Sequence, residues 1–289
     1  MKIITQNYAT SFDGTAIHYC ASGEGSPAIV CCNCLGLTPC MFRHLVNYFS
    51  GKQRVVCWDY RGHGMSYFPR DADNIDTAAL VSDLLAVLDE ADLERAILLA
   101  HGSGVMIALE FMRSHPKRVS ALIAICGSHE GHFLRRLPVP RPEVLMKVAC
   151  SVGERFPGLM DFGLGRLSTT SLASFLMGEA FLDRSLVCDE DLCAFVQDIR
   201  MLDSELYFTL VKQMADQSAA DVLDGIRVPT LAICGGRDRL TPSDLMKQMV
   251  SRVPAAELFH VKNGTFALPV EQPETLNLRI DKFIRERVS

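Results

Sequence analysis

The sequence has little net charge and no long uncharged apolar run. Its 29 basic and 34 acidic side chains give a formal net charge of −5, which argues against a nucleic-acid surface or a basic membrane patch. A bilayer span needs roughly 18 consecutive apolar residues, and no run of that kind is present, so we expect no membrane span. The opening MKIITQNYATSFDG also lacks the apolar stretch of a signal peptide.

The sequence also lacks a cysteine pattern that would indicate a disulfide framework or a zinc site. Eleven cysteines are an odd number for a chain of 289 residues, and they are typical of reduced, mostly buried thiols in a cytoplasmic protein. Four of them, Cys31, Cys32, Cys34 and Cys40, lie close together in the spacing C-C-x-C-x5-C. That spacing is not a recognised zinc motif. We therefore expect no metal and no cofactor.

What the sequence does contain is an alternation of buried strands and amphipathic helices. The hydrophobic fraction is 48%, enough for a large core. Short runs that are apolar almost throughout predict strands covered on both faces of a parallel sheet. They are 28–32, 54–59, 95–100, 119–126, 230–234 and 256–261. Helical patterns at 39–50, 76–91, 104–115, 242–253 and 273–288 separate or follow them. The sequence thus predicts an α/β fold with a mostly parallel, doubly wound sheet.

The alternation is interrupted after Cys126. Residues 131–222 contain helical patterns at 143–152, 172–182, 189–201 and 204–215 but no convincing strand. We therefore predict a core domain formed by residues 1–130 and 223–289, with residues 131–222 inserted as a helical lid after the sixth strand. Open α/β sheets bind ligands at the carboxyl ends of their strands, so such an insertion is expected to cover a pocket.

Five segments, in this order, resemble motifs of the α/β-hydrolase superfamily over essentially the whole chain. They are Cys32–Gly36, Asp59–Ser66, Ala100–Gly104, Gly235–Asp238 with Pro242, and Asn263–Phe266 ahead of Glu271-Gln272-Pro273-Glu274. The resemblance implies the α/β-hydrolase fold. It assigns these segments to the oxyanion loop, the turn after the fourth strand, the nucleophile elbow, the acid turn and the histidine loop.

The elbow of this family carries a nucleophile at the apex of a G-x-S-x-G turn, with small residues two positions away on either side. Ser103 has His101 and Val105 at those positions, whereas Gly102 has Ala100 and Gly104. In the family a proline commonly follows fourteen residues after the apex, and 116 − 102 = 14 places Pro116 there. The resemblance therefore places Gly102 at the nucleophile position, without a nucleophile.

The same resemblance implies that the catalytic histidine is also replaced. In the family that histidine commonly stands five residues before the glutamate of E-x-P-E, and 271 − 5 = 266 is Phe266. A one-residue shift gives Thr265, which is no base either. The acid position keeps Asp238, whose role is open between a surviving general base or substrate anchor and a cap of the following helix.

The remaining candidate ligand-binding residues are Cys34, Leu35, Ser103 and Cys126, at or after the carboxyl ends of predicted strands. In the family, two backbone amides form the oxyanion hole: that of the residue after the apex, here Ser103, and one near Cys34. Since amides need no particular side chain, we expect them to polarise a carbonyl still.

Together these features predict a non-hydrolysing α/β-hydrolase homologue that binds a mostly apolar, carbonyl-bearing small molecule. It would be a receptor, carrier or regulatory pseudoenzyme, or a lyase, isomerase or cyclase that works by shape and by the amide donors. The alternative is an atypical esterase or thioesterase that uses Cys34, Ser103 or water activated by Asp238. A third class is a protein-interaction scaffold with a collapsed pocket.

Overall fold

The computed structural model describes residues 4–71, 73–131, 155, 182–201 and 203–288. Its centre is an eight-stranded sheet with the strand order β1-β2-β4-β3-β5-β6-β7-β8. The strands are β1 (Ile4–Thr10), β2 (Ala16–Ser22), β3 (Ala28–Cys32), β4 (Val55–Trp58), β5 (Ala96–His101), β6 (Val119–Ile125), β7 (Thr230–Gly235) and β8 (Ala256–Val261). β2 pairs antiparallel with both β1 and β4, and all the other pairs are parallel.

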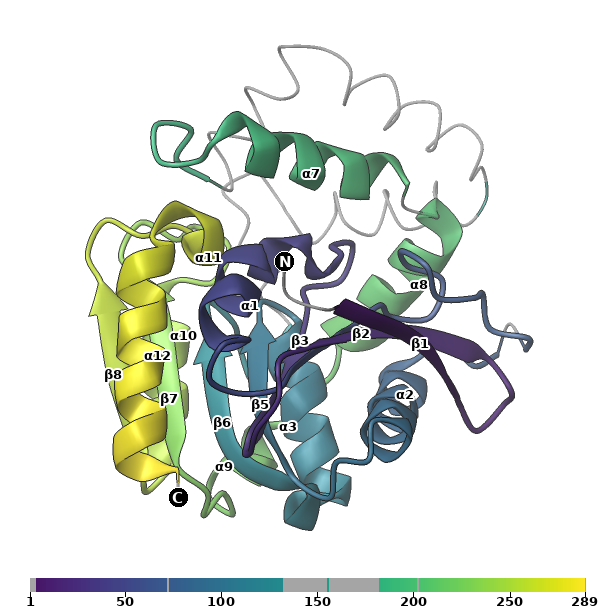
Figure 1. Ribbon diagram of the computed structural model, residues 1–289, viewed down its shortest axis with the longest axis horizontal. Coiled ribbons are helices and arrows are strands. Elements are labelled where there is room, and N and C mark those ends of the chain that lie inside the picture. Colours follow the sequence, from purple (N-terminus) through teal and green to yellow (C-terminus); the bar gives the residue numbers. More distant parts are fainter. Residues whose placement is uncertain (1–3, 72, 132–154, 156–181, 202, 289) are drawn as a thin grey trace.

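Helices cover both faces of this sheet (Figure 1). One face packs against α2 (Thr77–Glu90), α3 (Gly104–Ser114) and α10 (Ser243–Arg252), which supply Leu84, Ile107 and Met249 to a continuous core. The other face packs against α1 (Arg43–Phe49) and α12 (Pro273–Arg287) through Phe49 and Phe283. The predicted doubly wound α/β architecture is confirmed.

The strands in the middle of the sheet are buried on both faces, as their apolar runs predicted. Every residue of β3, β5 and β7 is buried, which is typical of parallel strands covered by helices. The predicted helix over 39–50 is in fact a 3-10 turn, η1 (Pro39–Phe42), followed by α1. A second short 3-10 turn, η2 (Pro116–Arg118), leads into β6.

Between β6 and β7 the described residues form three helices, α7 (Asp189–Arg200), α8 (Ser204–Ala215) and α9 (Ala220–Leu223). The predicted helices over 143–152 and 172–182 lie outside the described residues, apart from Leu182. Figure 1 shows α7 lying across one end of the sheet, above α1. A small apolar cluster that includes Leu37, Met41 and Val270, with Leu192 and Phe195 of α7 packed against it, joins this helix to η1 and to α11 (Leu268–Glu271).

No helix in the described part of the chain is both long enough and apolar enough to cross a membrane.

Candidate functional site

The turn between β5 and α3 forms a sharp elbow with Gly102 at its apex. β5 ends at His101 and α3 begins at Gly104. Gly102 has a φ of +58°, in the left-handed region that favours glycine. Its amide donates to the carbonyl of Ile125 on β6 at 3.1 Å, so the elbow is tied to the neighbouring strand. The residue at the apex therefore presents a bare Cα where a side chain could project.

Two side chains fill the space in front of this Cα. A Cβ at Gly102 would lie 2.8 Å from Cys34 Sγ and 2.9 Å from Phe266 Cζ, closer than non-bonded heavy atoms approach. Phe266, which the resemblance places at the histidine position, therefore lies directly in front of the apex. The structure also brings Cys34 to the same point. In this conformation no substituted apex residue fits without movement of one of these two side chains.

One of the two predicted oxyanion donors, the amide next to Cys34, is already engaged by a side chain. The amide of Leu35 donates to Ser103 Oγ at 2.7 Å. The Ser103 hydroxyl in turn donates to Cys34 Sγ at 3.5 Å. Ser103 is buried. A ligand carbonyl that used the Leu35 amide would first have to displace the Ser103 hydroxyl.

The two candidate thiols, those of Cys34 and Cys126, are held in the neutral form. Burial raises the pKa of the Cys34 thiol, and the Asp238 carboxylate raises it further, whereas hydrogen bonds from Ser103 oppose the shift. Burial also raises the pKa of Cys126 well above its ordinary value. Cys126 follows β6 with a φ of +44°, and its Sγ lies 3.5 Å from the carbonyl oxygen of Thr265. Because the thiolate is the nucleophilic form, neither cysteine is activated.

Asp238 is buried in the turn after β7 and uses its oxygens within that turn. Oδ1 accepts from the amides of Leu240 and Thr241, each at 2.9 Å, and Oδ2 accepts from the Thr241 hydroxyl. Burial raises the pKa of the carboxyl, although these hydrogen bonds lower it. The carboxylate thus closes the turn two residues before α10 rather than capping the first residue of the helix.

The loop that carries Phe266 is fixed from two sides. The His101 ring lies 4.5 Å, centroid to centroid, from the Phe266 ring, and Nε2 lies 2.8 Å from the carbonyl oxygen of Phe266. This geometry makes Nε2 the donor of a neutral imidazole. On the other side, the Glu271 carboxylate accepts from the amide of Thr265 at 3.0 Å and from its hydroxyl at 2.6 Å.

The buried His101 makes folding stability depend on pH. Burial lowers its pKa from 6.5 to about 4, so between these values the unfolded chain binds a proton that the folded chain does not. Its contribution is complete above pH 6.5, declines as the pH falls and is lost below pH 4, a difference of about 3 kcal/mol. Chemical denaturation at several pH values checks this. We expect His101→Gln to reduce the change in the free energy of unfolding between pH 6.5 and pH 4 by that amount. If the free energy of unfolding changed with pH as much in the variant as in the wild type, the imidazole of His101 would not be buried and neutral.

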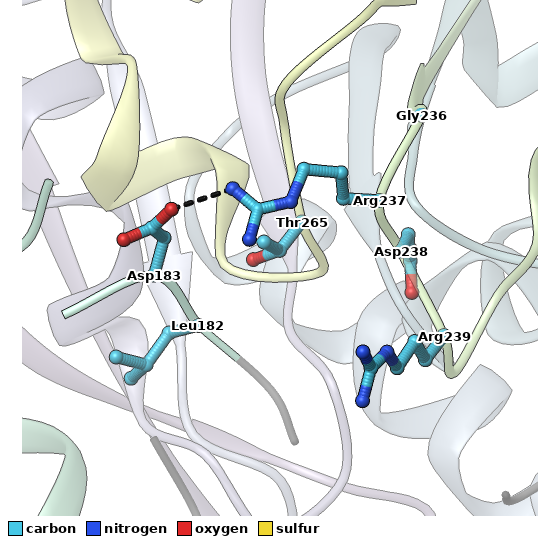
Figure 2. A pocket seen from close by; sticks show the side chains of 7 residues that line it. All are labelled: Leu182, Asp183, Gly236, Arg237, Asp238, Arg239 and Thr265. Carbon is cyan, nitrogen blue, oxygen red and sulfur yellow. Dashed lines mark hydrogen bonds and ion pairs between the residues drawn. The ribbon is translucent and has the colours of Figure 1, made fainter. Parts of the chain in front are cut away.

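A cavity of about 330 Å³ lies beside the acid turn. Its lining is mostly polar, as Figure 2 shows: Leu182, Asp183, Gly236, Arg237, Asp238, Arg239 and Thr265. Arg237 forms an ion pair with Asp183 at 2.6 Å, whereas the exposed Arg239 makes no ion pair with any described residue. This polar lining differs from the mostly apolar ligand that was predicted from Phe266 at the expected histidine position.

Among the described residues, no group of three His, Cys, Asp or Glu side chains is placed to hold a metal ion.

The chain belongs to the α/β-hydrolase family. The family model for the alpha/beta hydrolase fold matches residues 27–272. A 3-oxoadipate enol-lactonase from Acinetobacter baylyi is 24% identical over 282 residues, which cover 93% of each chain. An esterase from Thermogutta terrifontis superposes with a TM-score of 0.79 at 19% identity, covering 99% of this chain and 100% of that one. An enol-lactonase from Burkholderia xenovorans superposes with a TM-score of 0.78 at 21% identity, covering 97% and 100%. These structural similarities establish the fold.

Several contacts at the site were not predicted from the sequence. The bond from the Leu35 amide to Ser103 and the contact of His101 with the Phe266 carbonyl join residues far apart in sequence. The bonds from Thr265 to Glu271 join residues six positions apart, but they depend on how the loop turns into α11. The guanidinium groups beside Asp238 could have been noticed, because Arg237 and Arg239 flank it directly.

Proposed function

We propose that this α/β-hydrolase-fold protein binds a small carbonyl-bearing molecule and does not hydrolyse it by a serine-type mechanism. The observation that carries the proposal is the apex of the elbow. Gly102 offers no nucleophile, and the ring in contact range of its Cα belongs to Phe266, which cannot accept a proton. An acyl-enzyme route needs both groups, and loss of either typically costs about 10⁶ in turnover.

The proposed ligand combines an apolar body with at least one carbonyl oxygen. Phe266 supplies an apolar surface at the elbow, and the guanidinium groups of Arg237 and Arg239 line the neighbouring cavity, where they can donate to carbonyl or carboxylate oxygens. In this proposal residues 131–222 form the lid over the binding site, and the reduced thiols are those of a cytoplasmic protein.

The test measures turnover and binding on the same preparation. With chromogenic p-nitrophenyl esters and acyl-thioesters we expect no hydrolysis above that of heat-inactivated protein.

Medium-chain aliphatic lactones and ketones are expected to raise the Tm in proportion to the logarithm of their concentration, because a ligand that binds only the folded state stabilises it. Arg239→Ala should weaken this shift, whereas Arg227→Ala should not, because Arg227 does not line the cavity. Ligands that leave the Tm unchanged would instead favour a scaffold without a binding pocket.

The competing function is an atypical esterase or thioesterase that uses Cys34, Ser103 or water activated by Asp238. The enol-lactonase and esterase names of similar proteins keep this alternative open. Against it stand the raised pKa of the Cys34 thiol and the three hydrogen bonds that already occupy Asp238. Ester or thioester turnover that disappears in Cys34→Ala or Asp238→Ala, with the fold intact, would establish the alternative and refute our proposal.

A further inference from the structure

In the described part of the chain, β1 is an edge strand whose outer side is unpaired, and it lacks the residues that usually prevent such a strand from pairing with another. β1 ends the sheet, and in the described part of the chain only β2 pairs with it. Its seven residues, ITQNYAT, contain no charged side chain and no proline, and its register with β2 is continuous from Ile4↔Ser22 to Thr10↔Ala16. Proteins usually protect such edges with charges, prolines or bulges, because free N–H and C=O groups invite another strand.

The backbone groups that face outward can be identified from the ladder. The amide of Ser11 donates to the carbonyl of Thr15, and hydrogen-bonded pairs alternate along antiparallel strands. Odd-numbered residues of β1 therefore bond to β2. The N–H and C=O groups of Ile4, Gln6, Tyr8 and Thr10 face away from the sheet.

Exposed apolar side chains gather at the same corner. Five of the nine strongly exposed large apolar side chains in the described residues lie on β1, on its turn to β2 or on the loop after β4. They are Tyr8, Phe12, Met65, Tyr67 and Phe68. Tyr8 and Tyr67 touch edge to face, with centroids 6.0 Å apart. Apolar surface that is concentrated in one place marks an interaction site.

We propose that β1 is the contact strand of a homodimer, in which two copies pair their β1 strands antiparallel about a twofold axis. A second copy is the occupant that fits, because an uncharged edge offers no counter-charge to an acidic or basic partner. Two chains of net charge −5 can also approach there without placing like charges together. A twofold contact between identical strands is self-complementary.

The register that uses all seven residues centres on Asn7. It pairs Ile4 with Thr10 and Gln6 with Tyr8 of the second copy, so every outward N–H and C=O of β1 finds a partner, giving about eight backbone hydrogen bonds. Asn7 then lies opposite the Asn7 of the second copy, in a pair whose side chains are close together. Tyr8 lies one residue from the centre of this contact, and Phe12 lies just beyond the end of each paired strand.

Charge complementation at Asn7 tests both the interface and its register. Sedimentation equilibrium over a hundredfold concentration range should show a dimer for the wild type. Asn7→Lys and Asn7→Glu should each raise the dimer dissociation constant at least about tenfold, because like charges face each other across the axis. An equimolar mixture of the two variants should restore dimers. A merely structural role for Asn7 would not produce this rescue.

A proline substitution provides a second, independent arm. Gln6→Pro removes an outward N–H while leaving the bonds to β2, and proline is tolerated at edges of this kind. We expect it to weaken dimerisation about tenfold or more with an unchanged Tm, and Gln6→Ala to have no effect. A wild type that stays monomeric, a dimer that is insensitive to these changes, or single variants that dissociate without rescue in the mixture would each overturn the proposal. None of these outcomes depends on the proposed ligand.

Discussion

Ester hydrolysis is expected to appear when a hydroxyl group and an imidazole are introduced at the elbow and a neighbouring side chain is removed to make space for them. We predict that Gly102→Ser combined with Phe266→His and Cys34→Gly hydrolyses p-nitrophenyl butyrate about 10²-fold faster than the background rate measured with the wild type, the lower end of what a positioned general base contributes. Initial rates at matched protein concentration measure the effect. The gain stays far below that of an evolved hydrolase because Asp238 is committed to its own turn.

The third substitution follows from the distances at the apex. A Cβ on residue 102 would lie 2.8 Å from Cys34 Sγ and 3.0 Å from Cys34 Cβ, so Phe266→His alone does not make room. Cys34→Gly removes both atoms. A side chain at a φ of +58° also costs on the order of 1–3 kcal/mol of backbone strain. We therefore expect Gly102→Ser alone to lower the Tm and to remain inactive.

The matched control replaces only the hydroxyl. A variant with Gly102→Ala, Phe266→His and Cys34→Gly carries the same backbone strain and the same imidazole but has no nucleophile at the apex, and it should hydrolyse nothing above background. If the serine and alanine versions are both folded and equally inert, Gly102 is not the nucleophile position or Phe266 is not the histidine position.

Loss of Asp83 is expected to destabilise the fold by about 3–5 kcal/mol, since its removal takes from the buried Arg61 charge the carboxylate that binds two of its nitrogens and leaves only Asp13 as a charged partner. Arg61 is fully buried and donates to both Asp83 oxygens, at 2.8 and 2.6 Å. It also bonds to Asp13 Oδ2 at 3.0 Å and to the carbonyl of Asn74 at 2.7 Å. This network joins the β1–β2 turn, the loop between β4 and α2, and the middle of α2. Urea denaturation of Asp83→Ala against the wild type measures the loss.

An exposed ion pair supplies the comparison. Arg252 and Asp224 lie 2.5 Å apart at the surface, where solvent screens the attraction. Asp224→Ala is expected to leave the denaturation midpoint unchanged. If Asp83→Ala also left the denaturation midpoint unchanged, the Arg61 network would not be holding the three segments together.

The order of strands and helices could be predicted from the sequence because a strand that is buried on both faces is a short run of apolar residues. The apolar runs at 28–32, 95–100 and 230–234 correspond to β3, β5 and β7 within a residue. The β1–β2 hairpin was not predicted. Among the β1 residues whose burial is described, 5–10, only Ala9 is buried, so this strand carries almost no alternation of buried apolar and exposed polar residues. Its pairing depends on the turn at 11–15 instead.

The candidate site was predictable only where a residue type itself carries the chemistry. Glycine at position 102 and phenylalanine at position 266 can be read directly, and family spacing was enough to suggest that they meet. The position of the Cys34 sulfur and the engagement of the Leu35 amide by Ser103 depend on rotamers set by packing between distant loops. Sequence spacing does not encode those rotamers, so the expectation of free oxyanion donors could not anticipate them.

The most direct test of the central claim, that the elbow carries no activated nucleophile, is intact-mass analysis after incubation with excess fluorophosphonate. An activated hydroxyl group attacks the phosphorus of this reagent, forms an O–P bond and releases fluoride. We predict that the wild-type mass does not change, and that the variant combining Gly102→Ser, Phe266→His and Cys34→Gly gains one adduct on residue 102. A stoichiometric adduct on Ser103, or on any other residue of the wild-type elbow, would contradict our interpretation.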